Sequence, residues 1–513
     1  MSLSHSPKSL VSCKNFSIDN LRIAVDLSTL LPGGENGGVK PFTIETIKSI
    51  QQIEGDKISF IFLTWSKSHK EIQVIKRHND EIICVRDDPD NIETAAIQSI
   101  KVFGDIDLLL HLDVDVLYSP LSSSEFTCPS IPTITTIVDI LHRDYPNSLT
   151  SNQISDREIN FKNILHSSDL FQCISNYTAT QLKFHYKVQS ERIFVSYISI
   201  QKRLLNRNIS RYKITTKPYF LYPANAWVHK NHQTLLVAYR LYKTIIGDKA
   251  WDLALTGHED SAMNKLKDLT RVLGLSTSVH FCGHLNLRDY TPAWLGAEGL
   301  IFPSLHEGFG IPILEAMQFR VPIISNDAGA LKEIAKDAAI FVDCTKPKAL
   351  AEAMRLITEE KETRYEYINR GAERLKCFNL ITESKLLVEK FKLAKNLKSI
   401  FWHKGIASDG WTQFKAIISL PNTNDILTIK IVTNAIPQNR RIRIYNGTIP
   451  WGGYYLPKLQ TNNIIIKMQY YGKPLVLEIP DAKQMSKEDP RYLGINIKTV
   501  TIKDSVNNHF ELI

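Results

Sequence analysis

The chain has few of the features that mark a secreted, metal-stabilised or membrane-spanning protein. Its seven cysteines are scattered over 513 residues with no C-x-x-C pair, so neither a disulfide framework nor a zinc site is indicated. No stretch reaches the roughly 18 to 20 uninterrupted apolar residues of a membrane span, and the polar start MSLSHSPKSLVSCKN lacks the apolar core of a signal peptide. We therefore expect a cytoplasmic protein whose membrane contact, if any, is peripheral to the inner face of the membrane.

The excess of positive over negative charge is also modest. A formal net charge of +9 fits anionic small molecules, an anionic membrane surface or nucleic acid about equally well. The sequence contains no recognisable nucleic-acid-binding module, so we expect no nucleic acid partner. With 43% hydrophobic and 22% charged residues, a chain of this length is ordinary for a globular protein of two to four domains.

Short apolar strands alternate with helical segments in two successive halves, which is typical of two doubly wound α/β domains. A change to alternating β-type runs near residue 400 predicts an all-β sandwich, and a stretch rich in lysine and arginine predicts a solvated linker between the two α/β domains. The predicted boundaries are a polar tail at 1–20, a first domain at 21–205, the linker at 206–217, a second domain at 218–395 and the β domain at 400–513.

The run LHEGFGIPILEAM, residues 305–317, has the pattern of a site. It follows the apolar strand GLIFPS, and Pro312 suits the first turn of a helix. Glu307 then lies in a glycine turn and Glu315 on the helix, at the carboxyl end of a parallel sheet. This arrangement is a general recipe for binding an anion or a polyhydroxyl ligand. The plainer alternative is a pair of surface carboxylates favoured by the helix dipole.

Three stretches together resemble the retaining GT-B glycosyltransferases of family 4, also called group 1. They are YFLYPANAWVHKNH, then VHFCGH through PSLHEGFGIPILEAM, then VPIISNDAGALKEIAKDAAIFVD. The resemblance covers most of residues 21–395 and is strongest in the second domain. More loosely, it extends to bacterial mannosyltransferases of surface-polysaccharide assembly. It implies two Rossmann-like domains facing across a cleft, followed here by the β domain.

The resemblance also implies roles for individual residues. Glu307 contacts the donor sugar, Glu315 the ribose, and Lys230 the diphosphate leaving group, where a fixed cation stabilises the transition state more than the ground state. Glycines at 308 and 310 let the backbone approach the sugar. The implied donor-binding set also includes Phe309, Asn225 and the exposed amides of Ile313 and Leu314, with Gly37 and Gly38 from the glycine-rich loop of the first domain.

The sequence departs from the family at two positions. Asn225 stands where the family usually has an arginine, so phosphate binding depends more heavily on Lys230. Val138 stands where the family has a histidine before an aspartate, here Asp139, which we include among the catalytic residues. His142 could substitute as a general base, although a lone histidine is more often structural. Lys40 could assist at the phosphates or simply face solvent.

The expected reaction is transfer of a hexose, with retention of configuration, from a nucleotide diphosphate sugar to a glycan or lipid-linked acceptor in cell-surface polysaccharide synthesis. No metal or other cofactor is expected. GDP-mannose is the first guess for the donor and UDP-glucose the second, on the resemblance alone. Two alternatives stay open: a nucleotide-sugar epimerase of GT-B fold, and a degenerate protein that binds the donor without transferring it.

The β domain is rich in aromatic residues that could stack on sugar rings, although core packing is at least as good an explanation. These residues are Trp402, Trp411, Trp451, Tyr454 and Tyr455.

Overall fold

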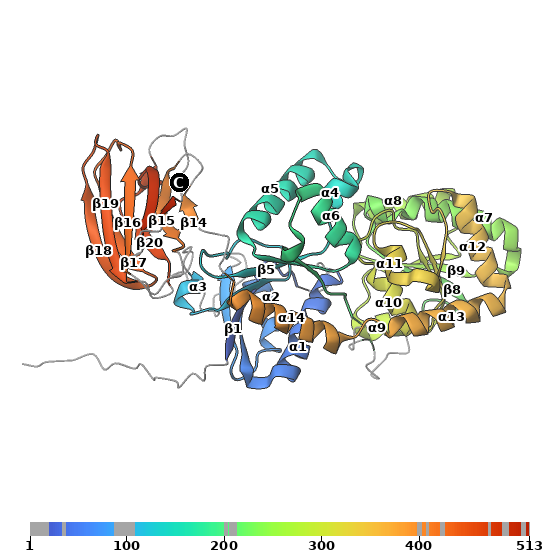
Figure 1. The fold of residues 1–513 in the computed structure, drawn as a ribbon. Helices are drawn as coiled ribbons and strands as arrows, with labels where there is room; N and C mark the ends of the chain where they lie inside the picture. The colour runs from blue at the N-terminus through green and yellow to red at the C-terminus, as the bar shows by residue number, and fades with distance from the viewer. Residues whose placement is uncertain are drawn as a thin grey trace, which may run out of the picture.

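A computed structural model gives the arrangement of the chain, and it contains three units in a row (Figure 1). The structure describes residues 20–32, 37–86, 108–199, 204, 213–397, 403–406, 410–420, 426–469, 473–484, 492–503 and 509–511. The N-terminal tail up to residue 19 and the basic linker up to residue 212 lie outside the described residues. No helix among the described residues is long and apolar enough to cross a bilayer.

The first unit is built on a seven-stranded sheet of order β3-β2-β1-β4-β5-β6-β7 in which every neighbouring pair is parallel. Its strands are β1 (Leu21–Leu27), β2 (Ile58–Trp65), β3 (Glu81–Arg86), β4 (Val116–Ser119), β5 (Thr133–Ile137), β6 (Leu170–Cys173) and β7 (Ile193–Val195). They read as nearly continuous apolar runs because helices cover both faces of a parallel sheet. The helices are α1 (Val39–Glu54), α2 (Ser66–Gln73), α3 (Leu108–His111), α4 (Leu141–Asp144), α5 (Ser151–Ser167) and α6 (Asn176–Tyr186).

The second unit repeats this topology with a six-stranded sheet of order β10-β9-β8-β11-β12-β13, again parallel throughout. Its strands are β8 (Tyr219–Pro223), β9 (Asp252–Thr256), β10 (Val279–Phe281), β11 (Ala297–Phe302), β12 (Ile323–Ser325) and β13 (Ala339–Phe341). Its helices are α7 (His232–Ile246), α8 (Ser261–Val272), α9 (Leu287–Leu295), α10 (Ile311–Gln318), α11 (Leu331–Ala335), α12 (Pro347–Glu359) and α13 (Lys361–Leu375). The strand order reverses beside β1 in the first sheet and beside β8 in the second, and such switch points are where doubly wound sheets bind ligands.

The last helix of the α/β part, α14 (Leu380–Lys395), crosses back to the first unit. Its side chains Leu387, Val388 and Phe391 are buried in the core formed by β1, β2, β4 and α1. Burying each such side chain contributes about 1.5–3 kcal/mol relative to exposure. The prediction that all of residues 218–395 belong to the second domain is therefore wrong for this helix.

The third unit is a sandwich of two antiparallel sheets, with strand orders β14-β15-β20-β17-β18 and β19-β16-β23-β24. The strands are β14 (His403–Ile406), β15 (Thr412–Ile418), β16 (Ile426–Thr433), β17 (Arg440–Asn446), β18 (Ile449–Leu456), β19 (Asn462–Gln469), β20 (Leu475–Glu478), β23 (Ile497–Lys503) and β24 (His509–Glu511), with a short pair β21 (Lys483–Gln484) and β22 (Tyr492–Leu493) beside them. Alternate side chains such as Ile429, Ile431, Ile442 and Ile444 fill the space between the sheets.

The sandwich packs directly against the first unit. Ile417 and Val476, on the outer face of the larger sheet, share an apolar cluster with residues of β1, β2, β3 and α3. Lys404 Nζ donates to the carbonyl oxygens of Glu125 at 3.0 Å and Thr127 at 2.7 Å. The sandwich is thus fixed to the first unit on the side away from the second unit (Figure 1).

Candidate active site

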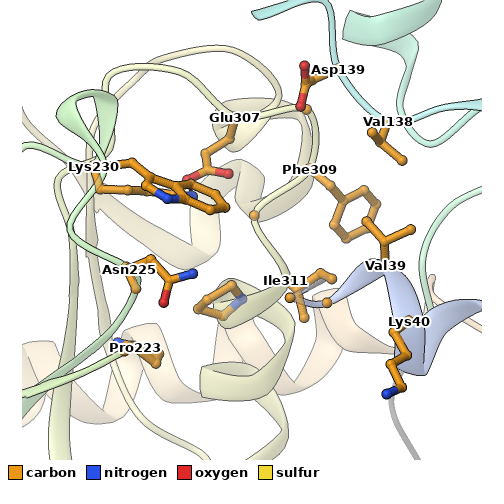
Figure 2. Close-up of a pocket in the computed structure, with 18 of the residues that line it drawn as sticks. Val39, Lys40, Val138, Asp139, Pro223, Asn225, Lys230, Glu307, Phe309 and Ile311 are labelled. Atoms are coloured by element: carbon orange, nitrogen blue, oxygen red, sulfur yellow. The ribbon is translucent and has the colours of Figure 1, made fainter. Parts of the chain in front are cut away.

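A cavity of about 1070 Å³ lies between the two α/β units, at the carboxyl ends of their strands. Ten of the predicted site residues line it: Gly37, Gly38, Asp139, Asn225, Lys230, Glu307, Gly308, Phe309, Gly310 and Glu315. Figure 2 shows several of these converging from both units. The side chains of Ile313 and Leu314 instead point into the core of the second unit, where both are buried.

Lys230 and Glu307 pair directly inside this cavity. Lys230 Nζ lies 2.5 Å from Glu307 Oε1, and the two side chains are only 13% and 12% exposed (Figure 2). Trp227 and Phe302 flank the ammonium, with each ring centroid 5.9 Å from Nζ. A charge pair in such a partly buried place is screened much less by water and salt than a surface pair. Two of the three residues predicted to be catalytic, Lys230 and Glu307, are thus in contact, and the third, Asp139, lines the same cavity.

The backbone around Lys230 is fixed by the neighbouring strands. It ends a short 3₁₀ turn, and the next residue, Asn231, adopts the left-handed conformation with φ 59°. Tyr222 from β8 donates through its hydroxyl to the carbonyl of Lys230 at 2.8 Å. The amide of Leu305, two residues before Glu307, donates to the carbonyl of His229 at 2.7 Å. These bonds hold the segments that carry Lys230 and Glu307 side by side.

Glu315 is the second glutamate of the cavity and is almost fully buried. Its Oε2 accepts a hydrogen bond of 2.6 Å from the hydroxyl of Tyr290 on α9. Hydrogen bonds to a charged group are worth about 1.5–3 kcal/mol, so this contact holds the carboxylate in one orientation. Tyr290 was not predicted as a site residue, because Pro292 inside α9 weakens the helix signal around it.

The glycines of the motif serve the contact between units as well as the cavity. A Cβ on Gly308 would lie 1.8 Å from the carbonyl oxygen of Val138 in the first unit, so only glycine fits. A Cβ on Gly38 would lie 2.1 Å from Ile311 Cδ1, the end of a side chain that can rotate, so this contact is less strict. Gly310 has φ +92°, which favours glycine, and begins α10.

One backbone expectation is wrong. The amide of Ile313 donates to the carbonyl of Gly310 at 2.9 Å, as the first turn of α10 closes, so it is not exposed for a diphosphate.

Asn225 holds a neighbouring loop. Its Oδ1 accepts from the amide of His258 at 2.8 Å, which fixes the turn after β9 beside the cavity. The residues that follow β10, from His284 to Leu287, line the same end of the cavity.

On the first-unit side, Asp139 lines the cavity and accepts from the amide of Leu141 at 3.0 Å and from Arg157 at 3.4 Å. Lys40 also lines the cavity, but it is buried, donates to the carbonyl of Leu31 at 3.0 Å and pairs with Glu71. The alternative that Lys40 simply faces solvent is therefore wrong. Four residues of the glycine-rich loop, 33–36, lie outside the described part of the chain.

His142 does not line the cavity. It is buried against Phe161, and its Nε2 lies 2.7 Å from the hydroxyl of Tyr186. Burial lowers its pKa. The structural explanation holds for this histidine, and the suggestion that it replaces a general base is not supported by its position.

Two other histidines sit next to Lys230. Burial, assisted by the nearby Lys230 ammonium, lowers the pKa of His229 and of His232 to about 4. Both rings are therefore neutral at physiological pH and add no positive charge to the cavity.

The aromatic residues of the β domain fall into two groups. Trp411 and Tyr454 pack against the core of the sandwich, whereas Trp451 and Tyr455 on β18 are 40% and 61% exposed. Trp402 lies outside the described residues.

Residues 206–374 match the family model "Glycosyl transferases group 1". The chain is 28% identical over 179 residues to the O-antigen chain mannosyltransferase RfbU of Salmonella typhimurium, which covers 34% of this chain and 46% of that protein. It is 22% identical over 267 residues to the O-antigen chain mannosyltransferase B of Escherichia coli, covering 51% of this chain and 70% of the relative. The match thus spans less than half the length of the Salmonella relative.

Solved structures show the same fold. Anabaena HepE in complex with UDP-glucose superposes with a TM-score of 0.56 at 15% identity, over 73% of this chain and 100% of that one. WaaG, a glycosyltransferase involved in lipopolysaccharide biosynthesis, gives a TM-score of 0.52 at 15% identity, over 72% and 99%. The predicted fold class is confirmed: the chain has the GT-B fold, with residues 206–374 matching the glycosyltransferase group 1 family and a C-terminal antiparallel β domain attached.

Proposed function

We propose that the chain is a retaining glycosyltransferase that moves a hexose from a nucleotide diphosphate sugar to a hydroxyl of a glycan or lipid-linked acceptor. The observation that carries this proposal is the cavity in which Lys230, Glu307 and Glu315 face the first unit. The named relatives are O-antigen chain mannosyltransferases, which favours mannose and a GDP-mannose donor. UDP-glucose is the second candidate, because a GT-B neighbour binds it.

In this proposal the donor lies along the second unit, from its base to its sugar. Glu315, oriented by Tyr290, accepts hydrogen bonds from the two ribose hydroxyls, since a carboxylate takes two hydroxyl donors in a fixed fork. The base lies against the loop from His284 to Leu287. The diphosphate lies between the start of α10 and Lys230, where a helix N-terminus and an ammonium both favour negative charge.

The observed Lys230–Glu307 contact suits both proposed roles. An ammonium has three donors, so Lys230 can keep its bond to Glu307 while it donates to a phosphate oxygen. The carboxylate has about four lone-pair sites and can accept from sugar hydroxyls at the same time. Lys230 therefore ties the position of Glu307 to the position of the leaving group.

Transfer breaks the bond between the anomeric carbon and the β-phosphate oxygen and forms one from the same carbon to the acceptor oxygen. The acceptor proton passes to the departing phosphate on the same face of the sugar. Charge grows on the diphosphate as the old bond breaks, and Lys230 is aimed at that charge. Retention through a covalent intermediate needs a second carboxylate about 5 Å from an acid. Direct attack by the acceptor on the face of the sugar from which the diphosphate leaves needs no such carboxylate.

The acceptor enters from the first unit. Asp139 lines that side and is oriented by Leu141 and Arg157, so it can accept a hydrogen bond from an acceptor or sugar hydroxyl. Val138 contributes its carbonyl to the contact with Gly308, not a side-chain base. A nucleoside diphosphate is a good leaving group, so the presence of Val138 in place of the family histidine is compatible with transfer.

A thermal-shift screen against GDP-, UDP-, ADP- and dTDP-sugars tests the proposal. A ligand at 100 times its Kd stabilises the folded protein by about 2.7 kcal/mol, which is readily detected. We expect stabilisation by one nucleotide class, lost in Glu315→Ala and retained in Glu298→Ala, an acidic residue on β11 that does not line the cavity. Lack of stabilisation by any of these donors would refute the proposal.

A further inference from the structure

The backbone on both sides of Glu307 is held by the first unit. Just before it, His306 Nε2 lies 3.1 Å from Oδ2 of Asp144, which ends α4. Both side chains are only 5% exposed. His306 thus reaches across the boundary between the units and makes a buried charge-assisted contact.

Just after Glu307, the carbonyl of Gly308 accepts a 2.7 Å hydrogen bond from Ser175 Oγ. Ser175 is fully buried and caps the N-terminus of α6 in the first unit. The Gly308 α-carbon also packs on the carbonyl of Val138, as described above.

The carbonyl of Glu307 itself is held by the amide of Ala330 at 2.9 Å. Ala330 begins α11, and Glu333 on that helix accepts from the amides of Asn176 and Tyr177 at 2.7 and 2.8 Å. Through Glu333, this third contact is also connected to the N-terminus of α6. Two of these contacts join the Glu307 segment directly to the first unit, and the Ala330 contact, within the second unit, is connected to it through Glu333.

We infer that Asp144 is a positioning residue that fixes Glu307 through His306 and makes its orientation depend on the closed arrangement of the two units. His185 Nε2 lies 2.7 Å from the other carboxylate oxygen of Asp144, Oδ1, whereas Oδ2 meets His306 and also accepts from the hydroxyl of Tyr177 at 3.1 Å. When the units separate, the loop loses His306–Asp144 and Ser175–Gly308 together and keeps the Leu305–His229 bond within the second unit.

This inference rests on the proposed function for its kinetic readout, and a double-mutant cycle between Asp144 and His306 tests it. The variants are Asp144→Asn, His306→Ala and the double variant. His185→Ala is the matched control, because His185 binds the same carboxylate from within the first unit. Misplacement of a reacting group by about 1 Å can cost up to about 100-fold, so we expect about tenfold lower kcat in each single variant with donor KM within about threefold.

The double variant should be no slower than either single variant, because both changes break one contact. His185→Ala should keep kcat within about twofold of the parent. Additive losses would show that Asp144 does not act through His306. An equal loss in His185→Ala would show that Asp144 has a general structural role. Either result would overturn the inference.

Hydrogen–deuterium exchange of residues 305–310 gives a readout that needs no turnover. We expect faster exchange in Asp144→Asn and His306→Ala and unchanged exchange in His185→Ala. Unchanged exchange in Asp144→Asn would overturn the inference even for a protein that transfers no sugar. A parent protein inactive on every donor, with faster exchange in Asp144→Asn, would refute the proposed function and leave the positioning contact standing.

Discussion

Lys230 Nζ and Glu307 Oε1 lie 2.5 Å apart at the centre of the cavity between the two α/β units. The pair joins a loop after β8 to a loop after β11, the two strands that flank the switch point of the second sheet. The cation proposed for the leaving diphosphate and the carboxylate proposed for the sugar are thus in direct contact.

Loss of the Lys230 ammonium should reduce turnover strongly. In Lys230→Ala the diphosphate loses its cation and Glu307 is left as a partly buried, unpaired charge. By analogy with removal of one oxyanion donor, kcat should fall by about 100-fold or more. Initial-rate kinetics at saturating donor measure this effect. The control is Lys267→Ala, which breaks the Lys267–Glu259 surface pair of 2.9 Å and should leave kcat unchanged. Turnover close to that of the parent in Lys230→Ala would remove Lys230 from the mechanism.

Tyr290→Phe should weaken donor binding without slowing the chemical step. The variant keeps the ring and loses only the hydroxyl that orients Glu315. A bond of about 1.5 kcal/mol corresponds to roughly a tenfold rise in donor KM, with kcat within about twofold. Steady-state kinetics over a range of donor concentrations separate the two constants. A fall in kcat at unchanged KM would contradict the assignment of Glu315 to the nucleotide.

Gly308→Ala should push the two units apart. The added Cβ would lie 1.8 Å from the Val138 carbonyl oxygen, so the backbone at Gly308 or at Val138 must move. Overpacking of this kind costs about 1–3 kcal/mol, so the melting temperature and the transfer rate should both fall. Gly452→Ala is the control, because its Cβ would meet nothing within 4 Å. Equal melting temperatures for the parent and Gly308→Ala would argue against the close contact between units.

Stability should fall as the pH is lowered from about 6.5 toward 4. His229 and His232 have a folded pKa of about 4, whereas the unfolded value is about 6.5. Within this window the unfolded chain binds more protons, so the free energy of unfolding drops by up to about 1.4 kcal/mol per pH unit for each histidine. Urea denaturation at pH 5.0 to 6.5 measures the slope. His232→Phe keeps a ring beside Tyr222 and should have a smaller slope than the parent; an identical slope would contradict the buried neutral state of His232.

Much of this architecture could be predicted from local pattern. The alternation of strands and helices in two successive halves, and the change to β-type runs near residue 400, predicted the two parallel sheets and the antiparallel sandwich. Two elements give only weak signals in the sequence, for physical reasons. The strand β18 contains Pro450, Gly452 and Gly453, which weaken a strand signal but are tolerated at the edge of a sheet. The helix α5 begins with the polar residues 151–153, so its start is marked only by the capping box of Thr150 and Gln153.

The candidate site was predicted less completely, because sequence order says little about contacts between domains. The motif around Glu307 predicted the loop and the helix, and the structure places both at the cavity. Nothing in the local pattern indicates that Asp144 meets His306 or that α14 returns to the first unit. Such contacts join segments more than a hundred residues apart and are set by how the two sheets face each other.

The most direct test of the central claim is transfer of radiolabelled sugar from the donor that stabilises the protein, measured for the parent and for Glu307→Gln. The variant keeps the side-chain shape and loses the charge that pairs with Lys230. We expect the parent to transfer or slowly release the sugar, and Glu307→Gln to do so at least about 100-fold more slowly while it still binds the nucleotide. Equal rates in the two proteins would contradict the account.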